Sequence, residues 1–251
     1  MIEIAGKPVR PESLSGVPDS GLEKQILAAM AADSTAFRYG TQAELLFELS
    51  LRAQTVAAAR ELDRSGMRFA TFRRSKCNPA FWNRTNEGGF RLKPGASPSA
   101  AILDIYRNGR SYATECATAM VIVYYRALLA VFGEQKFNRV FPRIELMNWH
   151  HLDRLLREIG LMNRFSLYLP GDRRYFANPD VDPVTPELQG ENVIEMGGGL
   201  YYGHDIGIRT ADQIIKALNQ SRIEDADDSA YLMDSAGRPD FGKLYRAFQQ
   251  N

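Results

Sequence analysis

The chain has 251 residues, of which 45% are hydrophobic and 24% are charged, and this composition excludes wholesale disorder. Lysine and arginine total 31 against 30 aspartate and glutamate residues, so the net charge of +1 excludes functions that need a strong field for nucleic acid or anionic lipid. Two cysteines are too few for a disulfide scaffold and indicate free thiols in a reducing compartment. We expect a single domain over residues 1–251, mainly helical over 1–66 and with its core in 67–251.

The N-terminal residues contain no apolar stretch of signal-peptide length, which predicts synthesis in the cytoplasm without secretion by that route. The longest apolar run, 116–125, stops at Arg126 and is much shorter than the roughly 20 residues that cross a bilayer. We therefore expect a core helix at this position and no membrane anchor.

The first third of the chain is predicted to be mostly helical. A short strand over 1–4 precedes two segments with apolar residues at helical spacing, 21–32 and 41–65. Thr41 precedes a glutamate in the pattern of a capping box, and Gly66 ends the second helix.

Short aromatic runs then predict hairpins over 67–93, followed by a helix over 99–106. Residues 114–132 are apolar on nearly every side, which predicts a helix buried in the centre of the domain. Further helices are expected at 134–140 and 150–159, strands at 165–170, 173–178, 192–196 and 200–208, and a helix behind Thr210 as cap. Helices followed by an antiparallel sheet indicate an α+β fold.

Cys116 is predicted in the first turn of the buried helix, with Thr114 as the candidate cap. Backbone N–H groups and the helix dipole at that position favour a thiolate, so we expect a lowered thiol pKa. The same N–H groups are suited to binding the oxyanion of acyl transfer. The alternative is a small buried side chain in the core, the commonest role of a free cysteine. Cys77 lies in a loop and is interpreted as a surface or structural thiol.

A thiol enzyme needs a base, and the sequence offers three histidines as candidates. His150 and His151 are adjacent at a predicted helix start and are typical of capping or solvated residues. If Gly197 and Gly198 form a two-residue hairpin loop, Glu191 faces His204 across the strands. Thiol, imidazole and carboxylate together are the components of a papain-like site. A purely structural hydrogen bond or ion pair in the sheet remains the alternative for this pair.

Several segments also resemble the small transglutaminases of the spore coat in endospore-forming bacteria, and the resemblance extends in order over nearly the whole chain. The matching segments are AELLFELSLR (43–52), VAAA (56–59), RFATF (68–72), YATECATAMVIVYY (112–125), GEQKFN (133–138), NWH (148–150), GENVI (190–194), YYGHDIGI (201–208) and SAYL (229–232). The resemblance implies a papain-like α+β fold with an additional helical layer, residues 67–251 being the papain-like core.

The resemblance also implies the roles of particular residues. Cys116 is the expected nucleophile and Glu191 its partner, with His204 assisting or orienting and Glu115 able to replace Glu191 in part. The family's site lies in a tunnel walled by aromatic side chains.

The matching positions of the tunnel imply substrate-binding roles for Phe69 and Trp149, and for Asn192 beside Glu191. Leu188 stands where an aromatic residue is expected, so the wall differs at that point.

The implied activity is that of a protein-glutamine gamma-glutamyltransferase, in which a thioester with a glutamine side chain forms, ammonia leaves and a lysine amine resolves the thioester to an isopeptide cross-link. A glutamate base requires a pKa raised by burial. No cofactor or metal is expected, and the acidic run 224–228 lacks the pattern of a calcium loop.

The implied partners are spore coat proteins with accessible glutamine and lysine, and neither nucleic acid nor membrane is expected as a partner. A monomer is expected, made in the mother-cell cytoplasm and then placed in the coat. Two alternatives remain, a papain-like cysteine peptidase or amidase and a coat component whose catalytic residues are vestigial.

Overall fold

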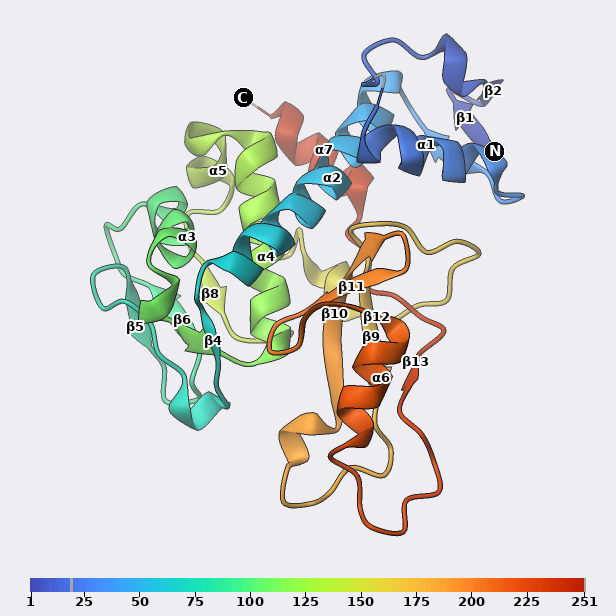
Figure 1. Ribbon diagram of the computed structural model, residues 1–251. Coiled ribbons are helices and arrows are strands. Elements are labelled where there is room, and N and C mark those ends of the chain that lie inside the picture. The colour runs from blue at the N-terminus through green and yellow to red at the C-terminus, as the bar shows by residue number, and fades with distance from the viewer. Residues whose placement is uncertain (19, 251) are drawn as a thin grey trace.

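The computed structural model describes residues 1–18 and 20–250, and it is built around a helical centre with sheets beside it (Figure 1). Across these residues, none of the helices combines the length and the apolar character that crossing a membrane requires. The α-helices are α1 (Leu22–Ala32), α2 (Gln42–Arg64), α3 (Pro98–Arg107), α4 (Cys116–Phe132), α5 (Glu134–Val140), α6 (Ala211–Asn219) and α7 (Phe241–Gln249).

Helix α4 is the centre of the core. Its residues from 117 to 125 are all buried, as the continuous apolar pattern predicts, and α2 packs along it (Figure 1). Thr41 caps α2 by accepting from the Glu44 amide. The predicted cap of α4 is wrong, because Glu115 and not Thr114 occupies that position and accepts from the backbone amides that follow Cys116.

An antiparallel sheet of five strands in the described residues lies against α4. In spatial order it contains β12 (Gly207–Thr210), β11 (Leu200–Gly203), β10 (Gly190–Gly197), β9 (Arg173–Ala177) and β13 (Tyr231–Leu232). Ile194 and Tyr202 pack into the core with α4, whereas Val193 and Tyr201 pack on the other face with Ile214 of α6. This alternation places the sheet between α4 and α6 and confirms the predicted α+β class.

Three smaller sheets lie outside this centre. They are formed by β1 (Ile2–Ile4), β2 (Lys7–Val9) and β3 (Phe37–Tyr39); by β4 (Arg68–Phe69) and β7 (Ala113–Thr114); and by β5 (Trp82–Arg84), β6 (Phe90–Leu92) and β8 (Glu145–Leu146). Strand β7 leads directly to Cys116, and its parallel pairing with β4 fixes the start of α4. Core residues of α2 pack in one cluster with those of α4 and α7. The parts 1–66 and 67–251 therefore share a hydrophobic core.

Two predicted elements are wrong, and the C-terminal helix α7 is among the elements that the prediction lacks. Residues 150–159 form turns and a 3-10 turn (Arg157–Gly160) in place of a helix, because the side chain of Asp153 accepts the Leu155 amide and competes with helical pairing. Residues 165–170 form no strand. Helix α7 packs against α2 through an apolar face that includes Leu244.

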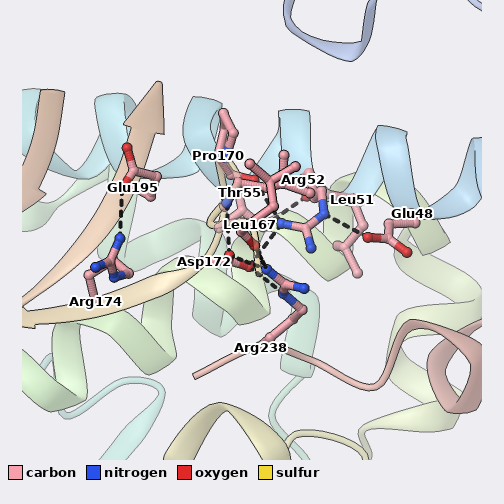
Figure 2. A network of polar contacts seen from close by, with 12 residues as sticks. Glu48, Leu51, Arg52, Thr55, Leu167, Pro170, Asp172, Arg174, Glu195 and Arg238 are labelled. Carbon is pink, nitrogen blue, oxygen red and sulfur yellow. Dashed lines mark hydrogen bonds and ion pairs between the residues drawn. The ribbon is translucent and has the colours of Figure 1, made fainter. Parts of the chain in front are cut away.

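A buried ion cluster joins α2, the loop before β9 and the segment before α7 (Figure 2). Asp172 accepts from Nη1 of Arg52 at 2.9 Å, from both Nε and Nη2 of Arg238 at 2.9 and 2.6 Å, and from the Leu169 amide at 2.9 Å. Arg52 also donates from Nε to Glu48 at 2.8 Å. Because Asp172 is completely buried, each carboxylate oxygen depends on these donors in place of water.

We predict that Asp172→Asn destabilises the fold by about 3–5 kcal/mol, because it removes the carboxylate that pairs with Arg238 and one of the two that pair with the buried Arg52. Burial raises the pKa of Asp172, but Arg52 and Arg238 reverse that effect and hold it below its ordinary value. A lowered pKa contributes stability above the unfolded value of about 3.9 and loses it as the pH falls through the folded value. Urea unfolding at pH 7 and in acid measures both effects.

The control is Asp234→Asn, because Asp234 forms an exposed pair with Arg164 and should change stability little. Equal midpoints for Asp172→Asn and wild type at pH 7 would contradict this account of the cluster.

Candidate active site

Cys116 opens onto a pocket of about 410 Å³, which is within the size range of ligand sites, roughly 300–1,000 Å³. The predicted site residues Phe69, Glu115, Trp149 and Asn192 all line it, together with Thr71, Phe72, Ala117, Asn148, Tyr175, Pro186, Glu187, Gln189 and Gly190. Among the described residues, Glu187 and Gln189 line the pocket, but Leu188 between them does not. The structure therefore gathers aromatic side chains around the thiol, and their substrate-binding roles remain predictions.

Glu115 lies at the N-terminus of α4 and caps it. Its carboxylate accepts from the Ala117 amide at 2.6 Å and the Thr118 amide at 2.7 Å, and Thr118 also donates its hydroxyl. Burial raises the pKa of Glu115, and these donors oppose the rise. Two amides expected to bind an oxyanion are thus occupied by Glu115.

Thr118 also connects α4 to the pocket wall. Its hydroxyl oxygen accepts the Asn148 amide at 2.8 Å, and Asn148 has a positive φ of 36°. That conformation is costly for a residue other than glycine and is held here by the surrounding contacts. The turn at Asn148 places the next residue, Trp149, in the pocket lining.

The surroundings of the Cys116 sulfur raise its pKa, which contradicts the expectation of a lowered value. Burial is the largest cause, and the carboxyl groups of Glu191 and Glu115 add to it. Asn192 opposes the rise by donating from Nδ2 to Sγ at 3.4 Å and from its backbone amide. The position at the helix N-terminus therefore does not by itself ionise the thiol.

Glu191 is buried beside the thiol on β10. Its pKa is raised to about 8. Burial is the largest cause and the nearby Asp205 and Glu115 carboxyls add to it, whereas hydrogen bonds from the His204 amide and the Cys116 thiol oppose the rise. The Glu191 side chain lies across Gly203, where a Cβ would come within 2.8 Å of Oε1. Glycine at position 203 therefore leaves room for the carboxyl group.

The predicted pairing of Glu191 with the His204 side chain is wrong. The hairpin turns at Gly198 and Gly199, an irregularity at Met196 shifts the register by one residue, and the last pair is Val193 with Gly203. Beyond that pair, Oε1 of Glu191 accepts the backbone N–H of His204 at 2.9 Å.

The His204 imidazole contacts the Tyr202 hydroxyl at 3.3 Å and the Arg68 carbonyl at 3.2 Å. Burial lowers its pKa to about 4, with a small opposing effect from Arg68, so the ring is neutral at pH 7 and a weak base. His204 therefore contacts Glu191 through its backbone N–H and not through its imidazole.

The remaining histidine and cysteine candidates lie elsewhere. His150 and His151 border a different pocket, and His151 is 3.8 Å from Glu145. Cys77 is half-buried against the core, and burial raises its pKa. These positions agree with the solvated and structural interpretations given above.

Sequence reasoning missed Tyr175 and Arg173. Tyr175 lines the pocket, and burial raises its pKa, with further contributions from the Cys116 and Glu191 charges. Arg173 is buried and contacts Asn192. A signal was present, because two adjacent arginines in a strand must place one side chain on each face, and buried arginines need partners.

A thiol at the start of a buried helix, a buried carboxyl group beside it and amide donors at the sulfur are the components that thiol-dependent acyl transfer requires. The antiparallel sheet packed on that helix is consistent with a papain-like arrangement.

Comparison with known proteins agrees with this class. Residues 1–248 match the family described as Protein-glutamine gamma-glutamyltransferase. A protein-glutamine gamma-glutamyltransferase of Bacillus mycoides (strain KBAB4) is 45% identical over 224 residues, which are 89% of this chain and 80% of that relative. A protein of the same name from Bacillus cereus (strain AH187) is 45% identical over 223 residues, again 89% and 80% of the two chains.

Among solved structures, a transglutaminase from Geobacillus stearothermophilus without its C-terminal extension matches with a TM-score of 0.76 and 47% identity, covering 83% of this chain and 98% of that one. The chain belongs to the protein-glutamine gamma-glutamyltransferase family. It is an acyltransferase, and the family expected from the sequence segments is confirmed.

We predict that kcat/KM for acyl transfer rises with pH through an apparent pKa of about 8. A base must be unprotonated to take the thiol proton, so activity falls below that pH. Glu191→Gln should lower kcat by about 10²- to 10⁴-fold and abolish this ionisation. The measurement is the pH profile of fluorescent amine incorporation.

Glu195→Gln is the matched control, because Glu195 lies on the same strand and burial raises its pKa to about 7, but its partner is Arg174. This variant should keep the wild-type profile. A profile that is unchanged in Glu191→Gln would remove Glu191 from the role of base.

Proposed function

We propose that Cys116 attacks the γ-carboxamide carbon of a protein glutamine while Glu191 accepts the thiol proton. The supporting observation is the buried carboxyl group, with a pKa of about 8, in hydrogen-bond contact with the thiol. The resulting tetrahedral intermediate collapses when the amide nitrogen takes the proton from Glu191 and leaves as ammonia. The product is a thioester on Cys116.

In the second half of the reaction a lysine ε-amine attacks the thioester carbonyl. Glu191 takes a proton from the attacking nitrogen, and the sulfur leaves as the thiol once it is reprotonated. An ε-(γ-glutamyl)lysine isopeptide bond remains, and Cys116 and Glu191 return to their initial protonation states. One carboxyl group thus serves as base and acid in both halves.

The pocket wall favours an amine over water as the acceptor. Phe69, Trp149 and Tyr175 contribute aromatic surface around the thiol, and such surface holds water weakly. A lysine side chain brings an apolar stem that this surface accommodates. The alternative function, a peptidase or amidase that uses the same thiol, requires water to reach the thioester.

We predict that the wild-type chain incorporates a fluorescent primary amine into casein, and that a calcium chelator leaves this labelling unchanged because thiol and carboxyl group carry the chemistry. Cys116→Ala should abolish labelling, and Cys77→Ala should retain it as the matched control. In-gel fluorescence measures all four samples.

Release of ammonia or cleaved peptide without labelling, by a wild-type chain with an active thiol, would assign the site to a hydrolase. Loss of labelling with the chelator would contradict calcium independence. Absence of every one of these activities would favour a vestigial coat component.

We further propose that the substrates are spore coat proteins and that the enzyme works as a monomer made in the mother-cell cytoplasm. The support is the ordered resemblance to spore-coat transglutaminases. A fluorescent fusion in a sporulating host is predicted to fill the mother cell first and to end on the spore surface. Fluorescence confined to vegetative cells, or an exported fusion, would contradict this localisation.

A further inference from the structure

Arg173 on β9 connects three parts of the site. Its Nη1 donates to Oδ1 of Asn192 at 2.7 Å, and its Nε donates to the Ile159 carbonyl at 2.7 Å. Its guanidinium stacks over the Trp149 ring, 4.2 Å from the centroid. The residue is only 3% exposed, so these contacts are made away from water and restrict the side chain to one orientation.

The contact with Asn192 determines which end of the amide faces the sulfur. A guanidinium has donors and no acceptor, so it selects the oxygen of an amide. With Oδ1 facing Arg173, Nδ2 lies on the other side, 3.4 Å from Sγ of Cys116. The flipped amide would set N–H groups against the guanidinium and an oxygen against a developing thiolate, and both contacts are repulsive.

We infer that Arg173 is a positioning residue that holds Oδ1 of Asn192 and so keeps the Asn192 side-chain amide directed at Cys116 during acyl transfer. This inference rests on the proposed function of Cys116. Asn192 then stabilises the thiolate before attack, because its N–H already points at the sulfur.

The surroundings of Arg173 support this assignment. Burial lowers the pKa of Arg173 to about 10, with opposing effects from Tyr124 and Cys116, so the side chain stays charged at pH 7. At Gly237 a Cβ would come within 2.8 Å of the Arg173 Nε and within 2.2 Å of the Ile159 carbonyl oxygen. Glycine at position 237 therefore leaves room for the hydrogen bond between the Arg173 guanidinium and the Ile159 carbonyl.

The test compares Arg173→Lys with Arg174→Lys, both in a Cys77→Ser background so that Cys116 is the reacting thiol. Arg174 is a close control because it is the next residue on β9, is also buried and stacks over the Tyr168 ring at 3.7 Å, but it pairs with Glu195 on the opposite face. Figure 2 shows that pair.

Arg173→Lys is expected to lower kcat for amine incorporation by about ten- to a hundredfold, with a smaller change in KM, because a misdirected donor affects the reacting state most. The rate of Cys116 alkylation by iodoacetamide should shift to higher pH in the same variant. Arg174→Lys should leave both readouts at the wild-type level. Similar losses in both variants, or an unchanged alkylation profile in Arg173→Lys, would overturn the inference.

A double-mutant cycle tests whether Arg173 acts through Asn192. In an Asn192→Ala background, Arg173→Lys should have little further effect on alkylation, because the amide that it directs is gone. Independent, multiplying effects would contradict the inference.

If circular dichroism shows that Arg173→Lys does not fold, Asn192→Asp provides the test. It keeps a partner for Arg173 but replaces the donor at the sulfur with an acceptor. Alkylation at the wild-type rate in this variant would overturn the inference. Because alkylation needs no acyl transfer, these outcomes stay separate from a wild-type chain that fails to incorporate amine, which would overturn the proposed function.

Discussion

The buried carboxylate of Asp172 is the constraint on which the arrangement of the site depends. Its arginine partners come from α2 and from the segment before α7, so one charge fixes two distant parts of the chain at the start of β9 (Figure 2). Tyr124 of α4 adds a hydrogen bond to the Gly171 carbonyl at 2.8 Å. The helix that carries Cys116 and the strand that carries Arg173 are therefore tied together near residue 172, and the relative position of thiol and amide donor follows from that connection.

The site balances opposing electrostatic effects. Burial favours the neutral forms of Cys116 and Glu191, whereas the N–H donors of Asn192 and His204 favour their ionised forms. The first effect is larger, so thiol and carboxyl group are both protonated near neutral pH. The donors are already in position for the charges that develop later, which lowers the cost of forming them in the transition state.

The sequence predicted the elements that depend on patterns among neighbouring residues. The apolar run before Arg126 located α4, Thr210 located the start of α6 with a full capping box, and the glycines after Met196 located the hairpin. The register of that hairpin was missed because the turn is formed by Gly198 and Gly199 and not by Gly197 and Gly198, and three consecutive glycines leave that choice open in the sequence. The direction of the thiol pKa shift was also missed. The sequence shows that Cys116 starts a helix, but the burial of the thiol and its closeness to the Glu191 carboxyl result from packing between distant segments.

The raised pKa of Cys116 has a consequence for the lifetime of the enzyme. Peroxide and disulfides react with thiolates and only slowly with thiols. A cysteine whose pKa is raised by burial and by a neighbouring carboxyl group is therefore protected from oxidation while no substrate is bound. The same burial that makes Glu191 a usable base thus preserves the nucleophile chemically until a glutamine side chain arrives.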